Sequence, residues 1–333
     1  MASASSTPKG VSIIIAPFHT GDRLRRVSRG PHRILKTGLV DALSSTGIEA
    51  IGLVGIERVD NFEGEIGRMF EVKRRIATAV RMQWQTIAFC WLLQVNATPP
   101  LVCTQASMQT WTSSRFDAHP DFDTPDNCSS GYSDGQGVAT LVGQCWRRLT
   151  YTISEFYPLS LNRLIYCGIR DFEPGHREKV EVLNVRAVYG GADHGGHYAQ
   201  ELCNSLNDQY RGGLAHVHLD LDMLETSVRI GNEYATAGGL DVDQLHSCLV
   251  EVVRARQPVS MTIASLNPDG QGIVAIANAA IAITKLVVPA AFGISEYTSS
   301  NTVYQLPFFI RCFYAACALT LLMTSLRLRG LPL

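Results

Sequence analysis

Apolar runs of strand length alternate along this chain with segments that have the periodicity of helices. The runs that predict strands are residues 11–16, 49–55, 87–95, 163–169, 185–189 and 259–266. The segments that predict helices are residues 34–43, 62–81, 138–149, 198–206 and 242–256. Because most of the strand segments are apolar throughout, we expect them to be buried on both faces of a parallel sheet. The alternation predicts an α/β fold with three α/β/α layers and a mostly parallel central sheet.

Polar residues at alternate positions interrupt this pattern in residues 115–121. If the segment continues as the end of a strand, its period of two directs Asp117, His119 and Asp121 to one side. Two carboxylates and an imidazole at such close range repel and desolvate one another unless a cation lies between them. A solvated polar strand end is the alternative for this segment alone.

A second segment, residues 216–222, has the same design. His218, Asp220 and Asp222 share one face, and the apolar residues between them are expected to face a packed layer. In a parallel sheet both acidic segments would end at the carboxyl edge of the strands, where ligands bind. The repetition of the pattern favours a metal site.

Four carboxylates gathered there carry a formal charge of about −4, which costs several kcal/mol even at an effective dielectric of ~20. One divalent cation neutralises half of this charge, and two neutralise it fully. Oxygen ligands with a minority of imidazole suit Mn, Mg or non-haem Fe. The sequence therefore predicts a two-metal cluster.

Composition narrows the possible partners. The chain has 333 residues, 46% of them hydrophobic, which is enough for one large α/β domain or two smaller ones. Its 29 Lys and Arg nearly balance its 30 Asp and Glu, so charge gives no reason to expect nucleic acid or an anionic membrane. The nine cysteines include no C-x-x-C pair and are interpreted as reduced thiols.

The two ends of the sequence differ from the rest. Residues 1–10 are interpreted as a disordered lead-in without the apolar core of a signal peptide, which predicts a cytoplasmic protein. Residues 289–333 form an atypical apolar tail. Within it, residues 308–323 are apolar apart from Arg311, and this run is shorter than the ~20 residues that span a bilayer. A packed helix or an atypical gene end is favoured over a membrane anchor.

Several motifs resemble those of one family. Residues 117–121, DAHPD, look like the DAHxD motif of the arginase/agmatinase/formiminoglutamase ureohydrolases, and residues 218–222, HLDLD, look like their SxDxD motif with His in place of Ser. Three further segments support the resemblance in the same order along the chain: RGP at 29–31, SGYSDGQ at 130–136 and GIRDFEPG at 168–175. The resemblance covers residues 11–288.

This resemblance implies an arginase-like α/β/α domain with two Mn²⁺ per chain. Asp117 and Asp220 would bridge the metals, His119 and Asp222 would bind one, and Asp121 the other. It also implies a metal-bridging hydroxide that attacks a linear C–N bond in a small guanidino, amidino or formimino compound. The assembly it implies is a homotrimer or homohexamer.

The resemblance also suggests residues that meet the substrate. Asp134 stands where arginases place a proton-shuttling His, so it joins Asp117 and Asp220 as a catalytic candidate. Ser130 is a substrate-binding candidate. Asp123 is either a turn cap or a substrate contact, and Glu173 either a substrate contact or a surface charge.

Three departures from the family pattern stand against these matches, and Asp134 in place of the shuttling His is one of them. The family has a GGDHS motif upstream of DAHxD, but residues 90–98 contain no His. His218 is either a replacement ligand or a hydrogen-bonded core histidine. Ser265 stands where the family has a Glu that pairs with guanidinium. The alternative function is therefore a catalytically impaired arginase-like protein with a structural or regulatory role.

Overall fold

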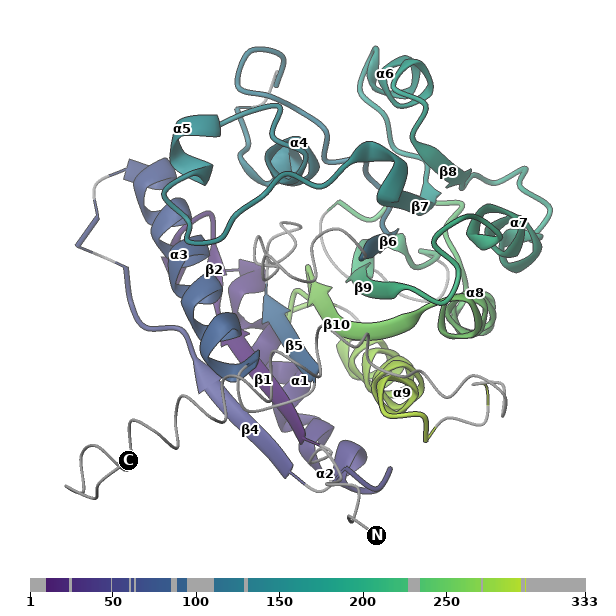
Figure 1. Ribbon diagram of the computed structural model, residues 1–333, viewed down its shortest axis with the longest axis horizontal. Coiled ribbons are helices and arrows are strands. Elements are labelled where there is room, and N and C mark those ends of the chain that lie inside the picture. Colours follow the sequence, from purple (N-terminus) through teal and green to yellow (C-terminus); the bar gives the residue numbers. More distant parts are fainter. Residues whose placement is uncertain are drawn as a thin grey trace, which may run out of the picture.

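The computed structural model has one large sheet at its centre, with helices on both sides (Figure 1). It describes residues 10–23, 26–48, 50–59, 61–62, 64–84, 89–94, 111–128, 131–226, 234–270, 272–294 and 297. Eight strands lie in the order β4-β1-β5-β10-β9-β6-β7-β8, and each neighbouring pair runs parallel. The prediction of a mostly parallel sheet is confirmed.

The elements follow the sequence pattern closely. The strands of the sheet are β1 (Gly10–Ala16), β4 (Ala50–Gly55), β5 (Phe89–Gln94), β6 (Thr112–Phe116), β7 (Leu164–Ile169), β8 (Arg186–Tyr189), β9 (Leu214–Asp220) and β10 (Gln257–Ala264). The α-helices are α1 (Gly30–Lys36), α2 (Leu39–Ser44), α3 (Gly64–Trp84), α4 (Gly137–Leu141), α5 (Arg147–Thr150), α6 (His176–Val182), α7 (Tyr198–Leu206), α8 (Val242–Ala255) and α9 (Ile273–Ala291). A small hairpin pairs β2 (Phe18–His19) with β3 (Asp22–Arg23).

Two apolar clusters, one on each face of the sheet, make the three layers. One cluster contains buried residues of α1, α2, α7, α8 and α9, and the other contains residues of α3, α4 and α6. Within β9, Val217 and Leu219 belong to the first cluster while Leu214 belongs to the second. Strands β1, β7 and β9 are accordingly buried along almost their whole length, as expected for a parallel sheet covered on both faces. The edge strand β4 is partly exposed.

Two predicted helices are interrupted in the structure. The helix expected over residues 34–43 ends at Lys36, because Gly38 has a φ of 100° and restarts the chain as α2. The helix expected over 138–149 divides into α4 and α5, with Gly143 at φ 75° and Trp146 at φ 51° between them. Helices α6 and α9 were not predicted from the pattern.

Helix α9 is long and apolar enough to cross a membrane by length and composition alone. In the fold it packs against β10 and α8, and most of its residues are buried. Its hydrophobicity is therefore explained as that of a core helix. The predicted tail run 308–323 and residues 1–9 of the predicted lead-in 1–10 lie outside the described residues, so the domain boundaries stay a prediction.

The start of α1 packs directly onto the chain that follows β10. A Cβ on Gly30 would lie 2.3 Å from the carbonyl oxygen of Leu266, so only glycine fits this approach. Arg29 forms an ion pair with Asp269 beside it. The RGP segment thus attaches the first helix to the edge of the sheet where the polar residues gather.

Lys73 on α3 provides a test of the second apolar layer. Its side chain is 7% exposed, its Nζ lies 4.8 Å from the centre of the Phe70 ring, and burial lowers its pKa from 10.5 to about 8. The folded state thus binds this proton less tightly than the unfolded state, so stability increases as pH rises from about 8 to 10.5. The gain is at most about 3 kcal/mol.

We expect Lys73→Met to remove this increase. The measurement is the free energy of unfolding in urea across pH 7 to 11, compared between wild type and variant. Lys36→Met, at an exposed position of α1, is the matched control and should keep the wild-type dependence. The same pH dependence in Lys73→Met as in wild type would contradict the assignment.

Candidate metal centre

The two acidic segments meet because β6 and β9 are neighbouring parallel strands. Phe116 pairs with Leu219 in the register, so Asp117 and Asp220 follow side by side at the carboxyl edge. The next strand, β10, adds Ser265 beyond its end, and the Ser265 hydroxyl donates to Oδ2 of Asp220 over 2.5 Å. This edge is where the sequence predicted the site.

The first acidic segment is a loop rather than a strand, which corrects the expected geometry. Strand β6 ends at Phe116, and Asp121 has a left-handed φ of 48°. The loop is fixed by hydrogen bonds from the Tyr166 hydroxyl to the Pro120 carbonyl (2.6 Å) and from Val138 N–H to the Asp121 carbonyl (2.8 Å). A curled loop, and not strand alternation, directs these side chains inward.

The second segment curls in a similar way after β9. Asp222 lies in the short 3₁₀ turn Leu221–Met223, and its N–H donates to Oδ1 of Asp220 over 3.1 Å. Ala118 N–H donates to Oδ1 of Asp222 over 3.3 Å, which joins the two acidic loops. The prediction that the intervening apolar residues face a packed layer is confirmed, since Leu221 is fully buried.

At the carboxyl edge of the sheet, one group of ligand atoms has the geometry of a cation site. Nδ1 of His119 lies 3.3 Å from Oδ2 of Asp222 and 3.7 Å from Oδ1 of Asp117. One ligand atom from each of these residues lies within 4.8 Å of the others. Two carboxylates and one imidazole at this range suit a divalent cation with a preference for oxygen ligands.

A second group consists of Asp117, His218 and Asp220, whose ligand atoms also lie within 4.8 Å of one another. His218 is fully buried, and neither of its ring nitrogens has a hydrogen-bond partner among the described residues. Burial, together with the charge of Arg115, lowers the pKa of His218 well below its ordinary value. The described residues thus give no support to the interpretation as a hydrogen-bonded core histidine, and a neutral ring without partners among them is suited to a ligand.

Arg115 is the cluster residue that the sequence reasoning missed. Its side chain is 1% exposed, and its Nη2 donates to Oδ2 of Asp117 over 2.7 Å and to Oδ2 of Asp121. Burial lowers the pKa of Arg115, but Asp117 and Asp121 raise it above its ordinary value. The signal was present, because Arg115 precedes Asp117 by two positions and so shares its side of the strand.

Protons partly compensate the charge of the cluster. Burial, with Asp222 and Asp117 nearby, raises the pKa of Asp220 well above its ordinary value. Burial, with Asp117, raises the pKa of Asp121 in the same direction. Burial opposes protonation of His119, yet Asp222 and Asp117 raise the pKa of this ring well above its ordinary value. Residues that bind protons to relieve their repulsion fit a divalent cation, which would displace those protons.

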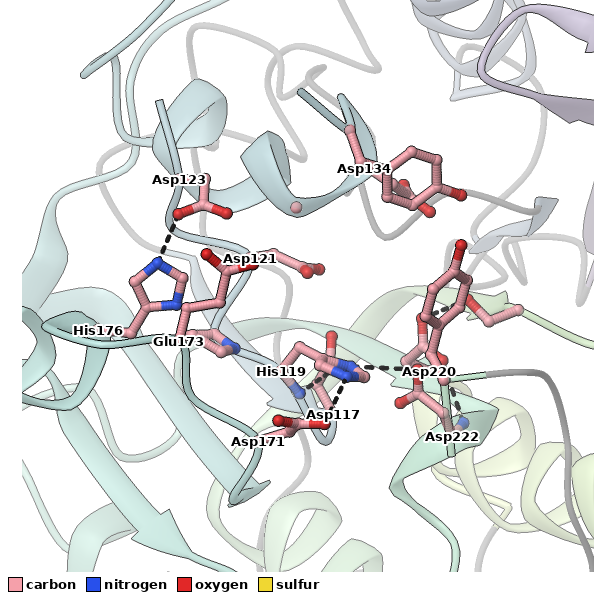
Figure 2. Close-up of a pocket in the computed structure, with 15 residues that line it drawn as sticks. Asp117, His119, Asp121, Asp123, Asp134, Asp171, Glu173, His176, Asp220 and Asp222 are labelled. Atoms are coloured by element: carbon pink, nitrogen blue, oxygen red, sulfur yellow. Dashed lines mark hydrogen bonds and ion pairs between the residues drawn. The ribbon is translucent and has the colours of Figure 1, made fainter. Parts of the chain in front are cut away.

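The cluster opens into a cavity of about 340 Å³ (Figure 2). Its lining residues are Asp117, His119, Pro120, Asp121, Asp123, Tyr132, Asp134, Gly135, Asp171, Glu173, His176, Asp220, Asp222, Tyr234 and Ser265. The cavity thus brings together the metal-ligand candidates, Asp134, Asp123 and Glu173, while Ser130 lies outside the described residues. No lysine or arginine is among the described residues that line it.

Two of the lining residues pair with imidazoles. Nε2 of His176, the first residue of α6, lies 2.6 Å from Oδ1 of Asp123 (Figure 2). Asp171 lies 3.5 Å from Nε2 of His119 and accepts a hydrogen bond from Thr236. Hydrogen bonding to His119 lowers the pKa of Asp171 to about 2, so this carboxylate stays ionised and orients the ring. Neither pair was predicted, because their partners come from separate loops.

Aromatic rings form one wall of the cavity. Tyr132 and Tyr234 stack with their ring centres 5.8 Å apart, and the Tyr132 hydroxyl contacts Nε2 of His19. By contrast, His194 stacks on Tyr198 with the two ring centres 3.7 Å apart, and it is not among the residues that line the cavity.

A parallel α/β/α sheet with aspartates and histidines clustered beyond its central strands defines a three-layer protein with a candidate metal centre. Comparison with known sequences is consistent with this class. The sequence model of the Arginase family matches residues 9–288, most of the chain, and the protein belongs to that family. Family membership implies a metal-dependent ureohydrolase.

The relatives agree over most of their length. An arginase of Glaciozyma antarctica is 23% identical over 315 residues, covering 86% of this chain and 89% of the relative. The structure of Entamoeba histolytica arginase in complex with L-ornithine superimposes with a TM-score of 0.72 at 18% identity, covering 85% and 99% of the two chains. Formimidoylglutamase of Bacillus subtilis gives 0.62 at 16% identity, covering 89% and 91%. These structures show the shared fold.

We expect Mn²⁺ to stabilise chelator-treated protein through the group of Asp117, His119 and Asp222. At 100 times the dissociation constant the gain is about 2.7 kcal/mol, which corresponds to a rise in Tm of several degrees. Asp222→Asn should lose most of this rise, because it removes one charged ligand. The control is Asp41→Asn, at an exposed position of α2. An equal rise in Asp222→Asn and wild type would count against this group as the binding site.

Proposed function

We propose that the protein hydrolyses a linear C–N bond in a small guanidino, amidino or formimino compound with the help of bound Mn²⁺. The observation that carries this proposal is the group of Asp117, His119 and Asp222 at the bottom of an acidic cavity. Family membership supports the class of reaction. The expected two ions per chain, the trimeric or hexameric assembly and the cytoplasmic location stay predictions.

Individual residues of this chain have separate roles in the proposed reaction. Asp117 and Asp222 supply negative charge for the cation, and Asp171 holds the His119 ring in position. When bound, a divalent cation lowers the pKa of water toward neutral, which supplies a nucleophile. Asp220 would face the same reacting region, with the Ser265 hydroxyl fixing one of its oxygens.

The charge of the cavity favours a cationic substrate. Beyond the metal-ligand candidates, the lining includes the carboxylates of Asp123, Asp134, Asp171 and Glu173. A guanidinium or amidinium is planar and can donate to such carboxylates, while the stacked tyrosines offer a face for cation–π contact. A second positive charge at the far end of the substrate would therefore be favoured over a negative one.

Two residues could protonate the leaving amine. Asp134 lies in the 3₁₀ turn Asp134–Gln136 and lines the cavity, in agreement with its role as the expected catalytic acid. His176, held by Asp123, is the second group of suitable chemistry, because an imidazole can donate a proton near neutral pH. We propose Asp134 as the donor and His176 as the alternative.

We expect amine-terminated guanidines to be the better substrates. Agmatine and 4-guanidinobutyrate form a matched pair that differs only at the far end, which is an ammonium group in agmatine and a carboxylate in 4-guanidinobutyrate. The acidic lining should make kcat/KM for agmatine at least about tenfold higher, a difference of ~1.4 kcal/mol. Urea release with Mn²⁺ present is the measurement, and a preference for the carboxylate compound would contradict the charge argument. The alternative of a catalytically impaired relative predicts no turnover of either compound or of formimino compounds.

We expect Asp134→Asn to lower kcat by roughly 10²- to 10⁴-fold, the usual contribution of a general acid, while Mn²⁺ content is unchanged. His176→Gln is the matched variant at the second candidate donor and should retain most of the activity. If the large loss occurs in His176→Gln instead, the proton comes from His176 and the assignment to Asp134 is wrong.

A further inference from the structure

Arg115 lies at the centre of the carboxylate cluster. It faces the same side of the sheet as Asp117, and its neighbour in the register of β9 is His218. Its guanidinium bridges Asp117 and Asp121 by donating one nitrogen to both. A bridging position between two buried carboxylates is the position of a cation.

The family resemblance gives this same position to a metal. In the arrangement that the resemblance implies, Asp121 binds only the second ion, and Asp117 bridges the two ions. In this chain both carboxylates already receive a charged donor, and the upstream segment that would hold the second ion's imidazole has no His. Residues 95–100 of that segment lie outside the described residues.

The net charge of the cluster also argues against a second metal ion. The four clustered aspartates carry a formal charge of about −4, and Arg115 with one divalent cation reduces this to about −1. A second divalent cation would make the buried cluster positive, with the guanidinium and the ion directly repelling each other. Guanidinium and metal therefore compete for Asp117 and Asp121.

We propose that the guanidinium of Arg115 takes the place of the second metal ion, so that each chain holds a single divalent cation at Asp117, His119 and Asp222. This inference rests on the proposed function, which requires at least one cation. It replaces the expectation of two ions with one ion and one permanent internal cation. A guanidinium cannot bind a metal ion, because its nitrogens have no free lone pair. It neutralises the carboxylates without the uptake of an ion from solution.

The proposal also gives His218 a defined state. Its ring lies beside Arg115, and its Nε2 lies 4.0 Å from Oδ2 of Asp117, too far for a hydrogen bond. With Arg115 in place, this ring has no ion to bind. Once the guanidinium is removed, Asp117, His218 and Asp220 form a complete group of ligands for a second ion.

The test is the metal content of the full chain after chelation, reloading with Mn²⁺ and desalting, together with its electron paramagnetic resonance spectrum. Wild type should hold about one Mn²⁺ per chain and give the hyperfine pattern of an isolated ion. Arg115→Met has similar length and no charge. It should hold about two Mn²⁺ per chain and give the pattern of an exchange-coupled pair.

Two sets of variants identify which residues hold each ion. His119→Ala should remove the single ion of wild type, and adding His218→Leu to Arg115→Met should return the content to about one. Arg256→Met is the matched control. Arg256 is also a fully buried arginine paired with an aspartate, Asp208, but it precedes β10 at the opposite edge of the sheet. This control should leave the metal content at the wild-type value.

Each outcome separates the inference from the proposed function. Two coupled ions in wild type overturn the inference and leave the proposed function standing. No ion in wild type overturns the proposed function and the inference with it. One ion in both wild type and folded Arg115→Met shows that Arg115 does not exclude the second ion, which also overturns the inference. If Arg115→Met does not fold, the metal content and spectrum of wild type still test the inference, because one isolated ion agrees with it and two coupled ions overturn it.

Discussion

Repulsion among buried carboxylates is the constraint on which the site depends. Asp117, Asp220 and Asp222 are almost fully buried and lie beyond two neighbouring strands, where their charges cannot be screened by water. Three kinds of compensation surround them: raised pKa values, the imidazole of His119 and the guanidinium of Arg115. Positive charge in the cluster offsets this repulsion, and a bound cation would therefore stabilise the folded state further.

The parallel sheet makes this concentration of charge possible. Apolar side chains cover both faces of the sheet and leave the polar groups at its carboxyl edge, in short loops that are held by main-chain hydrogen bonds. The carbonyl of Ala118 accepts hydrogen bonds from the N–H groups of Arg170 and Asp171, so the loops after β6 and β7 form one hydrogen-bonded unit. The Arg170 side chain donates to Thr236, Gly168 and Asp222 carbonyls and extends this unit to the loop after β9.

Both the cluster and the cavity wall differ from the family motifs that the chain resembles. Relative to the family motifs it resembles, the chain has no His in the upstream segment, Ser265 where a carboxylate is expected and His218 in place of Ser, and the buried Arg115 lies beside His218. Ser265 binds Asp220 and so serves the cluster, while charge at the cavity wall comes from Asp134, Glu173 and the Asp123–His176 pair. The groups that neutralise the cluster and the groups that line the cavity wall are therefore separate sets of side chains.

The layers, most of the strands and the ligand candidates could be predicted from the sequence, because apolar runs and the DAHPD and HLDLD motifs are local patterns. The sequence also indicated where the site lies, since the carboxyl ends of parallel strands share one edge. Tertiary structure alone decided the breaks at Gly38 and Gly143 and the curled loop around Asp121. It also decided the contacts of Arg115, because these depend on the register between β6 and β9 and on loop closure, which no local pattern encodes.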